Sequence, residues 1–209
     1  MSALQHATIL VTPIQQNCTL LWDSASLEAV VVDPGGDVPR IIEAIEGLRL
    51  RVGQIWLTHG HIDHAGGAAA LRDALGVPVW GPREADRFLL DGLPAAGRQF
   101  GFEARAVTPD RWLADGDALT VGSHAFTVRA VPGHTPGHVV MLTDRLAVVG
   151  DVLFQSSVGR TDFPYGDGTA LLLGIHKVLM PLPDNTAVLC GHGPATTIGA
   201  ERQGNPFLS

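Results

Sequence analysis

Cysteine, positive charge and long apolar runs are all scarce in this 209-residue sequence. Its two cysteines, Cys18 and Cys190, each lie in an apolar, strand-like segment, so we expect buried reduced thiols and no disulfide framework. No apolar run is long enough to cross a bilayer, and the first ten residues lack the basic start and apolar stretch of a secretory signal. We therefore expect a cytoplasmic protein that does not associate with membranes.

Basic residues are outnumbered by acidic ones. Lysine and arginine total 14 against 21 aspartates and glutamates, which gives a formal net charge of -7 and a pI near 5.6. The arginines at 49, 51, 98 and 105 are dispersed along the chain and form no cluster. A surface of this charge repels phosphate backbones, so nucleic acid is not expected as a partner.

Apolar residues and turn formers are abundant. Hydrophobic residues make up 45% of the chain, enough to bury one sizeable core at this length. The 25 glycines and 14 prolines concentrate in turn clusters such as residues 33–36 and 132–133, which is typical of many short elements joined tightly. No linker or low-complexity tract interrupts them. The sequence therefore predicts a single domain over residues 1–209.

Three histidines and an aspartate lie within six positions, at His59, His61, Asp63 and His64. The apolar segment 52–57 before them predicts a buried strand, and residues 68–75 predict a helix closed by Gly76. The cluster thus occupies a strand-to-helix turn, from which side chains can converge on one point. His59 and His61 can face one metal while Asp63 and His64 face a second. Histidines with ordinary core or surface roles do not explain this spacing.

Three further groups of the same chemistry follow strand-like segments. His134 comes after residues 128–131, Asp151 after 146–150 and His192 after 188–190. An aspartate can bridge two cations because it has two oxygens. His138 is predicted to support the site and not to bind metal directly. Four strands that each end in a ligand predict a two-metal site at one edge of paired sheets.

Two residues near the cluster are predicted to orient its ligands. Asp33 ends the apolar strand 29–32 and points to the same edge, where a carboxylate commonly hydrogen-bonds a ligand histidine. Thr58, directly before the cluster, is predicted either to act in the same way or simply to end its strand.

These motifs resemble those of the metallo-β-lactamase superfamily, over nearly the whole chain. Within it the sequence looks most like short bacterial glyoxalase II-like hydrolases, through segments 16–18, 33–37, 58–64, 132–138, 150–154, 159–164, 191–194 and 205–207. The resemblance implies an α/β fold, a four-layer αββα sandwich with the metals at one edge. It also implies a ligand set in which every position is filled: His59, His61 and His134 for one metal, Asp63, His64 and His192 for the other, and Asp151 as the bridge.

The chain departs from full-length glyoxalase II enzymes after His192, because little sequence is left for the helical domain that builds much of their glutathione pocket. The substrate pocket is therefore expected to come from loops such as residues 82–99 and 159–168, and a homodimer is one way to complete it. Arg160 lies where these enzymes place a basic residue near the glutathione carboxylate. An ion pair with Asp162 is an equally good prediction for this arginine.

Two cations held close together lower the pKa of a bound water and supply a nucleophile without a dedicated base. We therefore predict a metal-dependent hydrolase with Asp63 and Asp151 as catalytic residues. The resemblance implies that its partner is a small-molecule thioester such as S-lactoylglutathione. Zinc is the favoured metal, and iron and manganese also suit these ligands. The alternative is a persulfide dioxygenase acting on glutathione persulfide, which the resemblance links to a single iron held by His59, His134 and Asp151.

Overall fold

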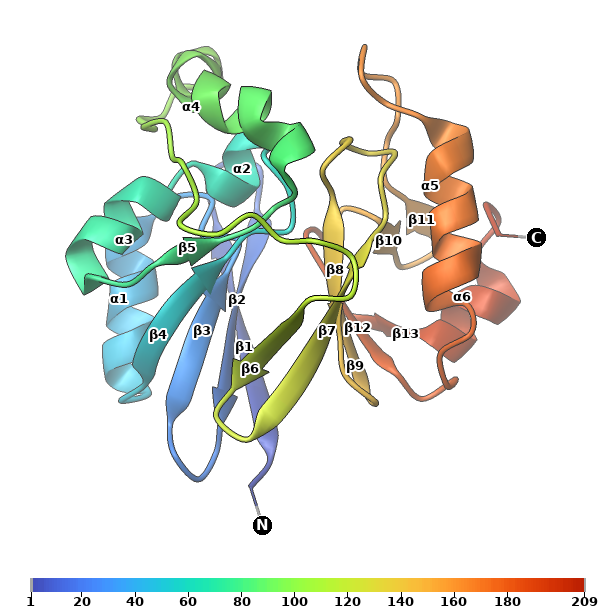
Figure 1. The fold of residues 1–209 in the computed structure, drawn as a ribbon, viewed down its shortest axis with the longest axis horizontal. Helices are drawn as coiled ribbons and strands as arrows, with labels where there is room; N and C mark the ends of the chain where they lie inside the picture. Colours follow the sequence, from blue (N-terminus) through green and yellow to red (C-terminus); the bar gives the residue numbers. More distant parts are fainter. Residues whose placement is uncertain (1, 209) are drawn as a thin grey trace.

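The computed structural model describes residues 2–208 and contains two main β-sheets, each covered by helices on its outer face (Figure 1). The first sheet has the strand order β1-β2-β3-β4-β5. The first three strands pair antiparallel, whereas β3, β4 and β5 pair in parallel. The strands are β1 (Leu4–Val11), β2 (Gln16–Asp23), β3 (Glu28–Val32), β4 (Arg51–Trp56) and β5 (Val79–Trp80).

The second sheet has the order β13-β12-β9-β8-β7-β6, in which only β12 and β9 pair in parallel. A small hairpin of β10 and β11 stands beside it. The strands are β6 (Ala118–Val121), β7 (His124–Ala130), β8 (Val139–Leu142), β9 (Leu146–Gly150), β10 (Leu153–Phe154), β11 (Ser157–Val158), β12 (Ala187–Cys190) and β13 (Thr196–Thr197).

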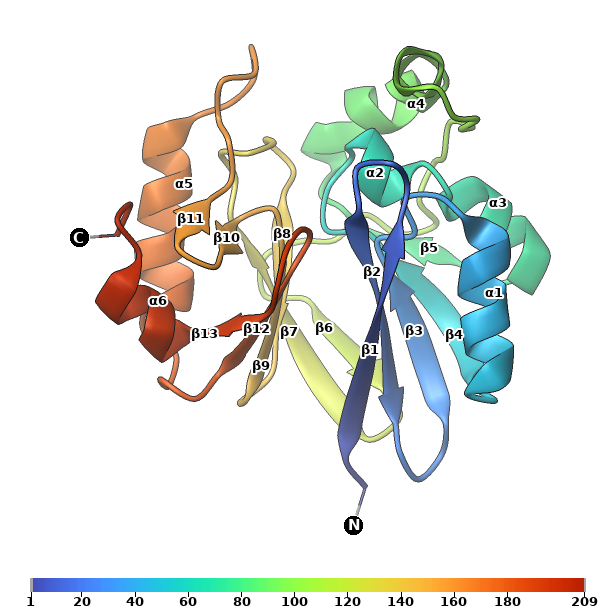
Figure 2. The ribbon, with the colours of Figure 1, turned by 180° about the vertical axis from the view of Figure 1, so that it is seen from behind.

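Helices lie on both outer faces, so the molecule has four layers (Figures 1 and 2). On the first sheet these are α1 (Val38–Gly47), α3 (Ala68–Leu75) and α4 (Arg87–Phe100), with the turns α2 (Ile62–Ala65) and η1 (Glu84–Asp86). On the second they are α5 (Gly168–Gly174), its π-helical continuation η2 (Ile175–Leu179), and α6 (Ile198–Gly204). The predicted α/β αββα sandwich is confirmed.

Apolar side chains fill the three spaces between the four layers. On β3, Val31 packs toward α1 and α3, whereas Val30 and Val32 pack between the sheets against residues such as Phe126. Successive residues of a strand point to opposite faces, so a strand covered on both sides must be apolar throughout. This explains the uninterrupted valines of β3.

Most of the predicted elements form where the sequence placed them. The strands expected before His59, His134, Asp151 and His192 are β4, β7, β9 and β12, and the helix over 68–75 is α3, closed by Gly76 in a left-handed conformation. Both cysteines are free and buried, as expected. None of the helices within residues 2–208 is long and apolar enough to cross a membrane.

The expectation of a loop over residues 82–99 is wrong, because most of this segment is η1 and α4. Gly92, Pro94 and Gly97 weaken the local preference of this segment for helix, and Pro94 removes one backbone donor from it. Leu90, Leu93 and Gly97 nevertheless share one buried face, and the packing of this face outweighs the weak local propensity. Residues 159–167 form a loop, as predicted.

Candidate metal centre

The histidines and aspartates singled out in the sequence meet at one edge of the two sheets, beyond the ends of β4, β7, β9 and β12. Two glycines make this convergence possible. A Cβ atom on Gly191 would lie 2.2 Å from Asp151 Oδ1, and one on Gly150, whose φ is +49°, would lie 2.4 Å from Thr58 Oγ1. A side chain at Gly191 would occupy the space between Asp151 and His64, and one at Gly150 would displace Thr58 and His138.

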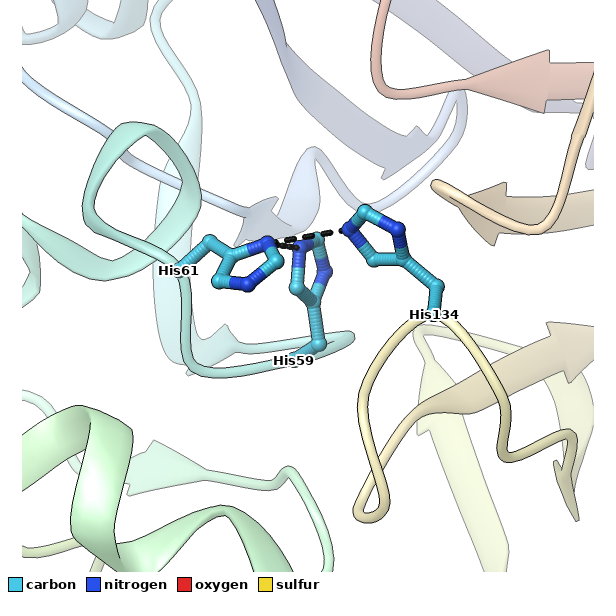
Figure 3. A group of neighbouring side chains, drawn as sticks. All are labelled: His59, His61 and His134. Carbon is cyan, nitrogen blue, oxygen red and sulfur yellow. Dashed lines mark hydrogen bonds between the residues drawn. The ribbon is translucent and has the colours of Figure 1, made fainter. Parts of the chain in front are cut away.

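His59, His61 and His134 form the first group (Figure 3). His61 Nδ1 lies 3.1 Å from His59 Nε2 and 2.9 Å from His134 Nε2. The three rings come from two loops, one after β4 and one after β7, and point toward a common centre. Three imidazole nitrogens at this separation suit a divalent cation such as zinc or iron.

Asp63, His64 and His192 form the second group. Asp63 Oδ2 lies 3.1 Å from His192 Nε2 and 3.9 Å from His64 Nε2. Asp151 stands between the two groups, with Oδ1 3.2 Å from His64 Nε2 and Oδ2 3.6 Å from both His134 Nε2 and His192 Nε2. The seven predicted ligand residues are therefore brought together, and Asp151 has one group on each side.

Hydrogen bonds on the outer side of the rings orient the inner nitrogens. His64 Nδ1 lies 2.9 Å from Asp33 Oδ2, His134 Nδ1 lies 2.8 Å from the Arg160 carbonyl oxygen, and His59 Nδ1 lies 3.0 Å from Thr58 Oγ1. When these nitrogens donate, the proton stays on the outer side and a lone pair faces the centre. The hydrogen-bond network thus presents the tautomers that metal binding requires.

Buried polar atoms without partners support the fit to a cation. Within residues 2–208, His64 Nε2 and Asp151 Oδ1 are buried and make no hydrogen bond, although they lie 3.2 Å apart. Buried groups of this kind are costly unless something else satisfies them. A cation between them would satisfy both.

The charges of the centre also favour cations. Burial, together with neighbouring histidines, holds the pKa of His59 well below its usual value and lowers the pKa of His61 to about 3. Burial opposes ionisation of Asp151, but the nearby histidines, His64 foremost, outweigh it and depress the pKa of this carboxyl. Burial likewise acts against His64, whose pKa is nevertheless raised because Asp151, Asp63 and Asp33 surround it. The lowered pKa values of Asp63 and Asp151 leave both side chains negatively charged at neutral pH, and a cation would balance these charges.

The predicted supporting residues all contact the ligands. Asp33 Oδ2 accepts hydrogen bonds from Thr58 Oγ1 at 2.7 Å and from His64, while its Oδ1 accepts the Thr58 backbone N–H. These bonds occupy Asp33, which is why its closeness to His59 and His64 does not make it a ligand. His138 Nε2 accepts the backbone N–H of Asp151 at 3.1 Å, and its ring stacks on His59.

Asp86 is a structural link that the sequence did not reveal. Its side chain is fully buried, and it accepts hydrogen bonds from the Gly60 and Gly137 backbone N–H groups and from Thr135 Oγ1. Gly60 lies between His59 and His61, and Thr135 follows His134. One carboxylate thus ties together the two loops that carry the three-histidine group. It lies at the end of η1, in a segment where nothing in the sequence pattern marks it.

Two more contacts were not foreseen. Tyr165 Oη lies 2.9 Å from His61 Nε2, where it can accept the ring N–H and leave Nδ1 facing the other histidines. Asn17 Nδ2 donates to the backbone carbonyls of Cys190 and Gly193, which fixes the loop that carries His192. Cys190 Sγ lies 3.1 Å from the His192 carbonyl oxygen and belongs to none of the ligand groups found within residues 2–208.

A cavity of about 640 Å³ opens above the centre, in the size range of small-molecule sites. His61, Asp63, Asp151 and His192 line its floor, α4 forms one wall, and the β10–β11 hairpin with the 159–165 loop forms the other. Arg160 lines this second wall, but its Nε and Nη2 donate to the two carboxylate oxygens of Asp162 at 2.7 Å and its guanidinium covers the Phe163 ring. The ion pair named as one alternative is therefore present.

The geometry agrees with a comparison of the whole chain with known families. Residues 11–192 match the metallo-beta-lactamase superfamily. The chain belongs to this superfamily. It is 44% identical over 205 residues to the hydroxyacylglutathione hydrolase GloC of Haemophilus influenzae, covering 96% of both chains. The chain thus belongs to a superfamily of metallo-hydrolases, and its histidines and aspartates form groups suited to binding metal ions.

Solved structures of relatives agree with this placement. The chain matches the B3 metallo-beta-lactamase BLEG-1 with a TM-score of 0.90 and 40% identity, covering 98% of this chain and 100% of that one. It matches TTHA1623 in a di-iron-bound form with a TM-score of 0.87 and 35% identity, covering 97% and 100%. Members of this superfamily therefore include one described as a lactamase and one holding two irons.

Proposed function

We propose that the chain is a binuclear metal-dependent thioester hydrolase that acts on compounds such as S-lactoylglutathione. The observation that carries the proposal is the position of Asp151 between two groups of three ligands, with one oxygen toward His64 and the other toward His134 and His192. The similarity to a hydroxyacylglutathione hydrolase over 96% of the chain supports the choice of substrate.

In this proposal His59, His61 and His134 would hold one ion, and Asp63, His64 and His192 would hold the other. Asp151, which lies between the two groups, would contribute to both sites. Zinc fits the donor set best, and the di-iron-bound relative supports iron as the other choice. Such ions, when bound, lower the pKa of water and polarise a carbonyl.

The side chains of the chain then position the reactants. Asp63 and Asp151 lie on the cavity floor, where their carboxylates can accept a hydrogen bond from the attacking water and hold it below the thioester carbonyl. Asp33, Thr58 and His138 keep the ligands in place through the bonds described above. Water adds to the acyl carbon, the carbon–sulfur bond breaks, and the thiol leaves with the second proton.

The test combines metal content with two activity assays on freshly purified protein. We expect two metal ions per chain by elemental analysis and release of thiol from S-lactoylglutathione, lost after chelation and restored by added metal. Replacing His192 by alanine should abolish both properties. His176→Ala is the matched control, because this histidine is exposed and far from the ligand groups in sequence and fold.

The alternative function gives a different result in the same experiment. One iron per chain, oxygen uptake with glutathione persulfide and no thiol release would overturn the hydrolase proposal in favour of a dioxygenase. In that case His59, His134 and Asp151 would be essential, and Asp63, His64 and His192 would be dispensable for iron binding.

A further inference from the structure

The apolar surface of helix α4 extends beyond the face that packs into the core. Leu90 and Leu93 are buried among the residues between α4 and the first sheet. A second stripe lies along the cavity beside the metal centre. It consists of Phe88, Leu89, Gly92, Leu93, Ala96 and Phe100. Leu93 and Ala96 also pack against the core, so the stripe adjoins the core face. Phe88, Leu89 and Phe100 are not part of this core cluster, and core packing therefore does not explain why they are apolar.

This stripe forms a groove that starts at the metal centre. Its members recur at helical spacing, and the cavity that they line also includes Gly60, His61 and Ile62. From Phe88 to Phe100 the helix rises about 18 Å, at 1.5 Å per residue. Phe88 is 48% exposed and Phe100 is 51% exposed, and both face the cavity. Large apolar side chains gathered on the wall of a cavity are typical of a ligand-binding surface.

The two walls of the cavity differ in polarity. No charged residue of α4 is among the residues that line the cavity: Arg87 pairs with Glu84, while Asp91 and Arg98 are exposed elsewhere on the helix. The opposite wall is mixed, because it carries the polar residues Ser157 and Arg160 beside the apolar residues Phe154, Val158 and Phe163. Arg160 is the only arginine or lysine on the cavity lining within residues 2–208. A thiol that bears carboxylates, such as glutathione, therefore fits the Arg160 wall. The acyl group is left to face α4.

We propose that the α4 groove binds the acyl group of the thioester, and that the chain prefers unbranched apolar acyl groups longer than lactoyl. This inference rests on the proposed thioester hydrolysis and specifies its substrate class. The acyl chain extends from the centre past Gly92 toward Phe100. Each methylene that enters the groove leaves water, which raises kcat/KM by about threefold per methylene until the groove is filled.

Gly92 allows the groove to be blocked without disturbing its surroundings. A Cβ atom at this position would meet no atom within 4 Å, and its φ is not in the left-handed region. Leucine is also a better helix former than glycine, so Gly92→Leu should fold. The matched control is Ala95→Leu, which adds the same side chain to an exposed position of the same helix that does not line the cavity.

The experiment measures kcat/KM for S-acetyl-, S-lactoyl-, S-hexanoyl- and S-octanoylglutathione, with metal content checked for each variant. We expect the octanoyl-to-acetyl ratio to exceed about 100 in the wild-type protein. The ratio should fall close to one in Gly92→Leu and stay high in Ala95→Leu. Phe100→Ala should reduce only the advantage of octanoyl over hexanoyl, because it changes the far end of the groove.

Failure of this inference is distinct from failure of the proposed function. Hydrolysis of all four substrates without a length preference, or an unchanged ratio in Gly92→Leu, would overturn the acyl groove and leave the hydrolase intact. If no thioester is cleaved, the groove is tested by measuring the binding of the uncleavable thioether S-(2-oxodecyl)glutathione to the wild-type protein and to Gly92→Leu by calorimetry. Binding that Gly92→Leu weakens at least tenfold supports the groove without hydrolysis, and equal binding or none by both proteins overturns it.

Discussion

The floor and the walls of the cavity are built in opposite ways. In the metal centre that forms the floor, His59, His64 and His134 are at most 2% exposed, and each is fixed by a hydrogen bond on its outer nitrogen. On the walls, Phe88 and Phe100 are about half exposed and contact the rest of the protein mainly through apolar surface. The chemistry is therefore held rigidly by directional bonds, whereas the surface that would select substrates depends on shape and polarity.

Substitutions on the floor of the cavity should reduce activity more than substitutions on its walls. Asp151→Ala should cause the largest loss. It removes the one carboxylate shared by both ligand groups, so both ions should bind more weakly. We expect kcat/KM for a thioester to fall on the order of 10³-fold, because metal ions contribute several kcal/mol of charge stabilisation. Elemental analysis and thiol release check this. Asp144→Ala, at an exposed position, is the control.

Asp86→Ala should loosen the two loops that carry the three-histidine group. It leaves the N–H groups of Gly60 and Gly137 and the Thr135 hydroxyl buried without their acceptor. The free energy of unfolding should fall by roughly 3 kcal/mol, and metal affinity should fall 10- to 100-fold. Urea unfolding and competition with a chelator measure the two effects. Asp91→Ala, on the exposed side of α4, should change neither.

A pair of variants separates the two ligand groups. Asp33→Asn disturbs His64 directly and His59 through Thr58. Thr58→Val removes the hydroxyl bonded to His59 and to Asp33 but leaves the bond between Asp33 and His64 in place. We expect Asp33→Asn to weaken binding of both ions by 10- to 100-fold and Thr58→Val to weaken chiefly the ion at the three-histidine group. Metal titrations monitored by calorimetry should show weaker binding at two sites in Asp33→Asn and at one site in Thr58→Val. Equal effects would contradict the network drawn here.

The smallest effect is expected where wall and floor meet. Tyr165→Phe removes the hydroxyl next to His61 Nε2 but keeps the ring contacts with Phe163 and Phe88. One partly exposed hydrogen bond contributes about 0.5–1.5 kcal/mol, so metal affinity should fall only about two- to tenfold. The thermal midpoint should stay within a few degrees. A loss as large as that of Asp86→Ala would show that the walls are as tightly coupled to the centre as the floor is.

The residues that meet at the centre could be picked out from the sequence because they follow apolar strands at short range. His59, Asp151 and His192 come within three residues of the ends of β4, β9 and β12, and no long-range information is needed to see this. The αββα layers were likewise predictable, through the resemblance and the fully apolar strands. Asp33 could be predicted to contact a ligand because it too ends a strand, β3.

Asp86, Tyr165 and helix α4 could not be read in the same way. Asp86 bonds loops that lie 26 and 51 residues away, and Tyr165 meets His61 across 104 residues. Nothing in their local sequence records these partners. The glycines and proline of α4 weaken its local preference for helix. The helix is stabilised by the packing of its apolar residues against the first sheet.

The sequence by itself determined which groups are present and the strand ends on which they stand, because hydrophobic periodicity and turn residues act between near neighbours. The tertiary structure alone decided which nitrogen of each histidine faces inward, which carboxylate ties the loops together, and which face of α4 borders the cavity. Hydrogen bonds and packing contacts between distant segments set these features, and such contacts exist only once the two sheets have come together.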